Sequence, residues 1–294
     1  MKNIFHGLGV ALITPFKQDG SIDYDALKRL IDYHLANGAN FFCILATTGE
    51  NPCLTAEEKR GITQFVKAEV AGRVPILRYC GGNHTAAVIE EIRQTDWEGI
   101  DGILSICPYY NKPTQEGIYQ HFKAIAAVSP LPIILYNVPS RVGVNMTAET
   151  TLRIANDCPN VVGIKEASGD LAQVEEILKH RPAHFEVISG DDAITFPLIA
   201  SGAIGVISVI GNIFPCKFSK LVKLTLQGRF DEARKIQFAL LDFYKLLFVE
   251  GNPAGCKAML SELGLIENVL RLPLVPVSEA THTKIRRLMK SSDE

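Results

Sequence analysis

The chain has 294 residues, of which 47% are hydrophobic and 21% are charged, so it is long enough to bury a large core and lacks the composition of a disordered protein. Thirty Lys and Arg residues against 32 Asp and Glu residues leave a net charge of −2. This balance gives no basic surface for nucleic acid or for an anionic membrane, so we expect neither as a partner.

Short apolar runs alternate with longer amphipathic segments along most of the chain. The apolar runs predict buried parallel strands at residues 9–14, 41–46, 75–79, 102–107, 132–136, 161–165, 186–189 and 203–208. The segments between them predict helices at residues 24–36, 56–71, 85–96, 115–128, 148–156, 170–179, 192–200 and 214–226. Eight successive strand–helix units predict an α/β fold, a (β/α)8 TIM barrel over residues 1–228.

The pattern changes after Gly228. Helical segments follow at residues 230–249, 255–263 and 277–290, without a further strand. We therefore predict a small C-terminal helical domain at residues 229–294. Helix boundaries have their own signals: Thr55 followed by Glu58 predicts a capping box, and Gly38, Gly72 and Gly202 stand where helices should end.

The compartment is indicated by the N-terminus and by the cysteines. The first residues lack an apolar core with a cleavage site, and no uninterrupted apolar stretch reaches about 18 residues. The seven cysteines are scattered and form no C-x-x-C pair, which favours reduced thiols over disulfides or a zinc site. We expect a cytoplasmic protein.

One lysine stands out in the predicted strand 161–165. Lys165 ends an apolar run, where a charged side chain is unexpected. Burial disfavours the charged form of a lysine and lowers its pKa, and a neutral lysine can form a Schiff base with a carbonyl compound. The alternative is a structural ion pair of Lys165 with Glu166 or Asp170. This stretch alone does not decide between the two.

Polar side chains gather where the predicted strands end. In a TIM barrel the active site lies at the carboxyl ends of the strands. Those positions are residues 14–15, 47–50, 81–83, 109–111, 136–139, 165–166, 189–192 and 208–209. The set is rich in hydroxyls and contains no histidine–carboxylate cluster with metal-ligand spacing, and the chain has no glycine-rich nucleotide fingerprint.

Tyr136 ends the strand that precedes the strand of Lys165. A phenol can pass a proton to or from an amine if a neighbour such as Thr48 stabilises the charge. The alternative is a packed ring with a hydrogen-bonded hydroxyl, the more common fate of a tyrosine at a strand end.

Two further features suit a carboxylate ligand. Arg141 follows Tyr136 by five residues and could bind a substrate carboxylate with two parallel hydrogen bonds; a surface arginine without a partner is the alternative. Thr47 and Thr48 precede Gly49 in a turn that offers hydroxyls and backbone N–H groups. A helix-entry turn would explain this tripeptide equally well.

Five motifs, taken together, resemble the dihydrodipicolinate synthase (4-hydroxy-tetrahydrodipicolinate synthase) family of the pyruvate-dependent class I aldolase and N-acetylneuraminate lyase superfamily. The motifs are Thr-Thr-Gly-Glu at 47–50, Pro-Tyr-Tyr-Asn-Lys-Pro at 108–113, Tyr-Asn-Val-Pro-Ser-Arg at 136–141, Gly-Ile-Lys-Glu at 163–166 and Ser-Gly-Asp-Asp at 189–192. The resemblance covers essentially the whole chain. It implies a lyase that condenses pyruvate with L-aspartate-4-semialdehyde to 4-hydroxy-tetrahydrodipicolinate, in lysine biosynthesis through diaminopimelate.

The resemblance also implies a role for each catalytic residue. Lys165 forms the imine with the ketone of pyruvate. Tyr136, Thr48 and Tyr110 form a proton relay, with Tyr110 contributed by a neighbouring subunit. Thr47 helps to position the relay, and Thr48 also binds the pyruvate carboxylate.

The remaining implications concern the second substrate, the cofactor and the assembly. Arg141 binds the carboxylate of the semialdehyde, while Gly190 and Ile207 line the pocket. The covalent imine requires neither an external cofactor nor a metal. The family resemblance implies a homotetramer built from two tight dimers.

Two alternative functions stay open at this point. An N-acetylneuraminate lyase or another sugar-acid aldolase would share the lysine and the tyrosine, but such enzymes commonly lack the equivalent of Arg141. A catalytically silent barrel that binds pyruvate is the alternative outside enzymes, and intact Lys165, Tyr136, Thr48 and Tyr110 argue against it.

The regulatory residues depart from the pattern of lysine-inhibited members of the family. Those members commonly carry two histidines and a glutamate where this chain has Ala56, Lys59 and Ala87, although Asn83 and Tyr109 are retained. The positive charge of Lys59 would oppose a cationic lysine ligand. We therefore expect feedback inhibition by lysine to be weak or absent.

Overall fold

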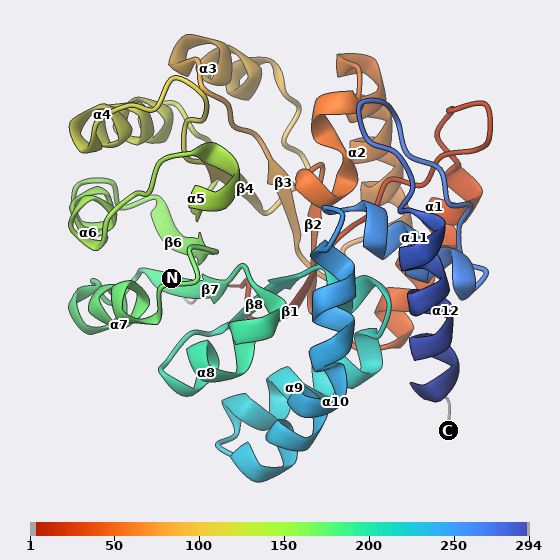
Figure 1. Cartoon of the computed structure of the whole chain (residues 1–294). Coiled ribbons are helices and arrows are strands. Elements are labelled where there is room, and N and C mark those ends of the chain that lie inside the picture. The colour runs from red at the N-terminus through yellow and green to blue at the C-terminus, as the bar shows by residue number, and fades with distance from the viewer. Residues whose placement is uncertain (1–3, 293–294) are drawn as a thin grey trace.

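The computed structural model describes residues 4–292 and shows a closed barrel of parallel strands surrounded by helices (Figure 1). The strands are β1 (Gly7–Ala11), β2 (Phe41–Ile44), β3 (Ile76–Tyr79), β4 (Gly102–Ile106), β5 (Ile133–Asn137), β6 (Val161–Glu166), β7 (Glu186–Ser189) and β8 (Gly205–Ser208). Each strand pairs with the next in the chain, and β8 pairs with β1 to close the barrel. The predicted TIM barrel is confirmed.

The helices alternate with the strands as the sequence predicts. They are α1 (Tyr24–Ala36), α2 (Ala56–Val70), α3 (Thr85–Gln94), α4 (Gln115–Ala126), α5 (Pro139–Val142), α6 (Ala148–Asp157), α7 (Leu171–His180), α8 (Thr195–Ala200) and α9 (Pro215–Leu226). Short 3-10 turns add η1 (Thr47–Gly49), η2 (Asn51–Cys53), η3 (Asp192–Ile194) and η4 (Ile210–Asn212). The predicted helix 192–200 is therefore η3 followed by α8, while α5, η1, η2 and η4 were not predicted.

The ends of the elements follow local chemistry. The Thr55 hydroxyl accepts a hydrogen bond from the Glu58 N–H, and the Glu58 carboxylate accepts one from the Thr55 N–H, so the predicted capping box is present. Gly38, with φ 91°, follows the end of α1 in the left-handed region that glycine tolerates best. The strand β1 begins at Gly7 and ends at Ala11, earlier at both ends than the predicted 9–14. Gly7 belongs to the strand because it pairs with Gly205 of β8.

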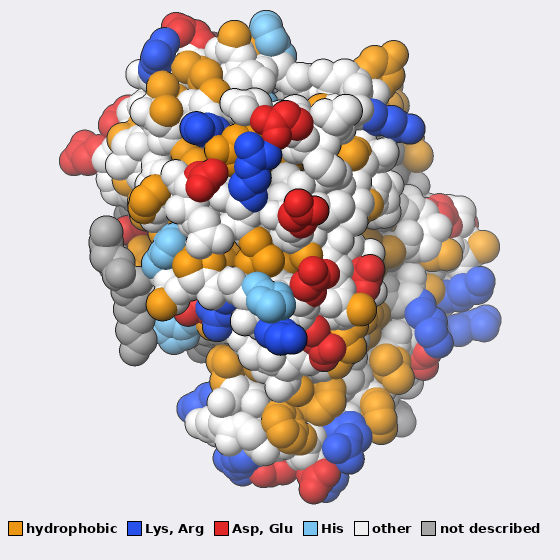
Figure 2. All heavy atoms as spheres, turned by 90° about the vertical axis from the view of Figure 1, so that its left-hand side faces the viewer, with side chains coloured by type: hydrophobic (Ala, Val, Ile, Leu, Met, Phe, Trp, Pro, Cys, Tyr) orange, Lys and Arg blue, Asp and Glu red, His pale blue; other side chains and the backbone are white. Residues whose placement is uncertain are grey.

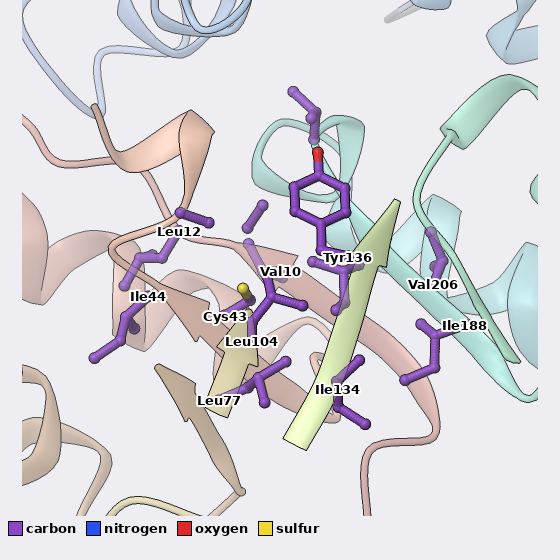
Figure 3. Packing of buried hydrophobic residues seen from close by; sticks show 14 of the residues in the cluster. Val10, Leu12, Cys43, Ile44, Leu77, Leu104, Ile134, Tyr136, Ile188 and Val206 are labelled. Atoms are coloured by element: carbon purple, nitrogen blue, oxygen red, sulfur yellow. The ribbon is translucent and has the colours of Figure 1, made fainter. Parts of the chain in front are cut away.

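The interior of the barrel is filled, so it is not a pore. Aliphatic side chains from neighbouring strands pack against one another, among them Leu104 and Ile134, which lie opposite each other in the register of β4 and β5 (Figure 3). At the amino end the rings of Phe5 and Phe41 meet edge to face at 5.4 Å. A Cβ on Gly9 would lie 2.2 Å from the Phe41 ring, so the absence of a side chain at Gly9 leaves room for this pair of rings. The packed interior and the rings at the amino end leave the carboxyl end of the described barrel for a site within it.

Three helices follow the last strand–helix unit. They are α10 (Phe230–Phe248), α11 (Ala254–Glu262) and α12 (Glu279–Ser292). The helix α10 packs against α9, and both α11 and α12 pack against α10 (Figure 1). These helices confirm the predicted helical C-terminus, whereas the division into domains at residue 228 stays a prediction.

Charged side chains of both signs are interspersed with apolar ones over the face that carries α4, α6 and α7 (Figure 2). That face shows no broad area of a single sign. Within residues 4–292, no helix combines the length and the apolar character needed to cross a membrane.

Two histidines are buried between the helices and the barrel. His34 of α1 is fully buried against Tyr33 and Phe42, and neither of its ring nitrogens has a hydrogen-bond partner among the described residues. Burial lowers the pKa of His34 to about 3 and the pKa of His121 to about 4. Both imidazoles are therefore neutral in the folded protein at pH 7.

We predict that His34 makes the fold sensitive to mild acid. Folding lowers the pKa of His34, so the unfolded chain takes up a proton at a pH where the folded protein does not. The contribution of His34 to the free energy of unfolding is therefore complete above the unfolded pKa of about 6.5 and is lost as the pH falls below that value. At pH 5 the cost reaches about 2 kcal/mol, at 1.36 kcal/mol per pKa unit. In thermal unfolding followed by circular dichroism, His34→Leu should lose less stability than the wild type between pH 7.5 and pH 5. The exposed His180 provides a control, since His180→Leu should leave the slope unchanged; equal slopes for wild type and His34→Leu would contradict the prediction.

Candidate active site

A cavity of about 460 Å³ opens at the carboxyl ends of the strands and is bounded on one side by α10. Six of the residues predicted from the sequence line it: Thr47, Thr48, Tyr136, Arg141, Lys165 and Gly190. They come from η1, β5, α5, β6 and the end of β7, so the closed barrel brings together side chains far apart in the chain.

Lys165 lies on β6 with only 5% of its surface exposed. The pairing of β5 with β6 sets it opposite Tyr136, and its Nζ lies 4.3 Å from the centre of the Tyr136 ring. In residues 4–292 no carboxylate lies within ion-pairing distance of this amine. Imine chemistry requires an amine that faces a cavity and is not held in an ion pair with a carboxylate.

Glu166 and Asp170, the two alternative partners of Lys165, are engaged elsewhere. Successive residues of a strand point to opposite faces, so Glu166 faces away from the cavity. Its carboxylate accepts hydrogen bonds from the Ser168 N–H at 2.7 Å and from the side-chain amides of Asn137 and Gln173. Asp170 caps α7 by accepting from the Gln173 N–H at 3.1 Å. The structural ion pair considered from the sequence is therefore absent.

Gly190 provides room for the lysine side chain. A Cβ at this position would lie 3.0 Å from both Cγ and Cε of Lys165 and 2.8 Å from Cβ of Ala167. A larger residue would displace Lys165, so the glycine after β7 fits the role expected of it.

Tyr136 and Thr48 present their hydroxyls to the same cavity. The Tyr136 ring projects beyond the aliphatic side chains of Leu104 and Ile134 toward the end of β5 (Figure 3). Thr48 is buried, and its Oγ1 accepts a hydrogen bond from the side-chain amide of Asn252 at 3.0 Å. Among the described residues no hydrogen bond uses the hydroxyl proton of Thr48, so this proton is available for a ligand.

Arg141 belongs to α5 (Pro139–Val142), a single turn that is followed by Gly143, whose φ is 78°. The arginine side chain is exposed at the edge of the cavity. Among the ion pairs and side-chain hydrogen bonds of the described residues, none involves its guanidinium. An arginine without an internal partner that faces a cavity is available for a carboxylate ligand.

Two predicted residues are not brought into the cavity. Ile207 is opposite Gly9 in the pairing of β8 with β1 and is 1% exposed. It is not among the residues that line the cavity of the single chain, so its place in the pocket stays a prediction. Val209, beyond the end of β8, lines the cavity instead, because its N–H and that of Ile210 are held by the buried Asp192 carboxylate at 2.9 and 2.8 Å.

Tyr110 is 89% exposed and has a φ of 70°, in a loop that does not reach the cavity of its own chain. The same loop is held by two hydrogen bonds, from the Asn83 amide to the Tyr109 carbonyl and from the Asn111 amide to the Asn83 carbonyl. A contribution from Tyr110 to another subunit stays a prediction.

The C-terminal helices contribute cavity residues that were not predicted from the sequence. Leu241, Tyr244, Lys245 and Phe248 of α10 line the cavity, as does Asn252 before α11. Leu241, Lys245 and Phe248 follow the spacing of one helix face, but that spacing is also expected of a helix packed on the barrel. No signal in the sequence told these residues apart from core residues.

A second cavity of about 490 Å³ lies between α2 and α3. Its lining includes Ala56, Lys59 and Ala87, the three positions that depart from the lysine-inhibited pattern. Asn83 and Tyr109 do not line it.

The site combines a buried amine, a phenol, two hydroxyls and a guanidinium. Within the described part of the chain, no group of three or more His, Cys, Asp or Glu side chains could hold a metal ion. Such a set can attack a carbonyl, move protons over short distances and hold carboxylates.

Comparisons with known proteins agree with this geometry. The chain is 57% identical over 284 residues to a 4-hydroxy-tetrahydrodipicolinate synthase of Parabacteroides distasonis, covering 97% of this chain and 96% of the relative. It is 58% identical over 283 residues to the synthase of Phocaeicola vulgatus, covering 96% and 95%. The crystal structure of dihydrodipicolinate synthase from Thermotoga maritima superposes with a TM-score of 0.96 at 41% identity, covering 99% of both chains. Since residues 4–292 also match the model of the Dihydrodipicolinate synthetase family, the chain belongs to that family.

Proposed function

We propose that the chain is a lyase that condenses pyruvate with L-aspartate-4-semialdehyde to give 4-hydroxy-tetrahydrodipicolinate, in lysine biosynthesis through diaminopimelate. The names of its relatives support this reaction. The observation that carries it is Lys165, a buried lysine without a carboxylate partner among the described residues, 4.3 Å from the ring of Tyr136.

The first half of the reaction builds a nucleophile. The Lys165 amine attacks the ketone carbon of pyruvate, and the resulting carbinolamine loses water to leave a protonated imine. Tyr136 donates the proton that the departing hydroxyl requires. The imine withdraws electrons, so the methyl group of pyruvate loses a proton and becomes the nucleophilic carbon of an enamine.

The second half joins the substrates and frees the enzyme. The enamine carbon adds to the aldehyde carbon of the semialdehyde, whose oxygen takes a proton. The amino group of the same substrate then attacks the imine carbon, which closes the ring and releases the Lys165 amine. The covalent imine supplies the electron sink, so no external cofactor is required.

Each remaining residue has a place in this scheme. Thr48 binds the pyruvate carboxylate through a hydrogen bond from its hydroxyl. In the proton-transfer steps Thr48 relays protons with Tyr136, and Thr47 helps to position that relay. Arg141 binds the semialdehyde carboxylate. Gly190 leaves space for Lys165, and Gly190 and Ile207 line the pocket.

We further propose a homotetramer, in which Tyr110 of one subunit completes the proton relay of its neighbour. Its 89% exposure in the single chain suits such a role. One structural relative, at 41% identity and a TM-score of 0.96, is described as the first monomeric dihydrodipicolinate synthase variant. Pyruvate and the semialdehyde are the proposed small-molecule partners.

We predict that pyruvate forms a covalent adduct with Lys165. Borohydride reduces the imine to a stable secondary amine, so intact mass spectrometry should show a pyruvate-dependent gain in the wild type and none in Lys165→Ala. Lys245→Met removes another lysine that lines the cavity, and this variant should still be modified. An absent adduct in the wild type would contradict the proposed chemistry and would leave the silent pyruvate-binding barrel.

We predict that Arg141 selects the second substrate. Arg141→Met should raise the KM for the semialdehyde by about tenfold or more and change the KM for pyruvate little, because a lost charge-assisted hydrogen bond costs about 1.5–3 kcal/mol. Lys245→Met removes another cation from the same cavity and serves as the matched control. An unchanged semialdehyde KM, together with cleavage of a sugar acid such as N-acetylneuraminate, would favour the aldolase alternative.

We predict that L-lysine inhibits the enzyme weakly or not at all. Lys59 lines the cavity between α2 and α3, where its positive charge would oppose a cationic lysine ligand. Lys59→Gln should therefore be more sensitive to lysine than the wild type in a steady-state assay. An inhibition constant in the micromolar range for the wild type would show that the prediction is wrong.

A further inference from the structure

The turn that carries Thr47 and Thr48 has unfavourable backbone conformations at both ends. Leu45, before the turn, has a φ of 58°, and Glu50, after it, has a φ of 55°. For residues other than glycine the left-handed region is unfavourable and persists where the surroundings enforce it. Something outside the turn must hold it in this shape.

Residues outside the barrel hold the turn through the side chain of Glu50. Its side chain is fully buried, and its Oε1 lies 2.5 Å from the Nζ of Lys257, which is also fully buried. Its Oε2 accepts a hydrogen bond from the Arg271 N–H at 3.1 Å. The carboxylate is thus fixed by residues more than 200 positions later in the chain.

Lys257 is itself immobilised in α11. Its Nζ donates to the Val269 carbonyl at 2.8 Å and lies 4.1 Å from the centre of the Phe16 ring. Burial lowers the pKa of Lys257, and the Glu50 carboxylate opposes that shift. Removing one partner of such a pair leaves a buried charge without compensation, which is strongly destabilising.

The barrel holds the other side of the same turn. The Thr14 hydroxyl at the end of the first strand region donates to the Gly49 carbonyl at 2.7 Å. With Gly49 tied to the barrel and Glu50 tied to α11, the hydroxyl of Thr48 is fixed relative to the cavity. Asn252, just before α11, adds its hydrogen bond to Thr48 directly.

We propose that Lys257 is a positioning residue for the pyruvate side of the site and acts through Glu50 on Thr47 and Thr48. This inference rests on the proposed function. It makes α11 part of the catalytic apparatus, although α11 contributes no side chain to the cavity lining. The buried charge pair specifies the shape of the turn as well as stabilising it.

The test compares Lys257→Met with Arg271→Met. In Lys257→Met the catalytic efficiency kcat/KM for pyruvate should fall about tenfold to a hundredfold, since a misplacement of about 1 Å can cost on the order of a hundredfold. The KM for the semialdehyde should stay unchanged, because Arg141 lies on α5 and not on the turn that Glu50 holds. Arg271→Met removes the guanidinium contacts with Glu58 and with the Gly20 and Cys53 carbonyls but keeps the Lys257–Glu50 pair and the backbone N–H at position 271 that donates to Glu50. It should therefore lower the thermal midpoint without the selective loss for pyruvate.

The double variant Glu50→Gln/Lys257→Met removes both charges and provides a folded protein if Lys257→Met does not fold. It should show the same selective loss for pyruvate at a higher thermal midpoint than the single variant. Wild-type kcat/KM for pyruvate in the double variant would overturn the positioning role, as would an equal loss in Arg271→Met.

Different results contradict the proposed function and the positioning role of Lys257. A wild-type protein that gives no reduced pyruvate adduct contradicts the proposed function, and the positioning role for Lys257 fails with it. An adduct in the wild type, with the pyruvate kinetics of the Lys257 variants unchanged, contradicts the positioning role alone.

Discussion

The pairing of β5 with β6 determines what this barrel can do, because it sets Tyr136 beside Lys165 inside the carboxyl end. Opposite faces of the same two strands carry Asn137 and Glu166, which are hydrogen-bonded to each other behind the barrel wall. A shift of one residue in this register would turn the amine outward and bring the carboxylate into the cavity. The strand register and the outer hydrogen bonds therefore depend on each other, and the amine is left without an acidic neighbour.

Two buried lysines show how the same side chain serves different purposes. Lys165 faces a cavity with an aromatic ring 4.3 Å away and no ion-pair partner among the described residues. Lys257 is enclosed on all sides and paired with Glu50. The first arrangement leaves a nucleophile, since the nitrogen can reach a ligand. The second fixes a charge in place, and its energetic cost is offset by the ion pair and by the Val269 carbonyl.

The C-terminal helices are more than an addition to the barrel. Residues of α10 form one wall of the cavity, Asn252 directs the Thr48 hydroxyl, and Lys257 holds the turn that carries it. A TIM barrel positions residues well at its strand ends but leaves its loops free to vary. Here the added helices constrain one of those loops, which explains how two threonines on a short irregular turn can have fixed positions.

Composition, periodicity and motif order in the sequence determined the barrel, the helix positions and most of the candidate site. These features are local, and strand ends converge by necessity in a closed parallel barrel, so Lys165, Tyr136, Thr48 and Gly190 could be placed together in advance. Other features depend on contacts between distant segments. The alternation of strand residues did not separate the buried Ile207 from Val209, which lines the cavity. The pairing of Glu50 with Lys257 and the contact of Asn252 with Thr48 join segments more than 200 residues apart, and only the tertiary structure decides which buried charges meet.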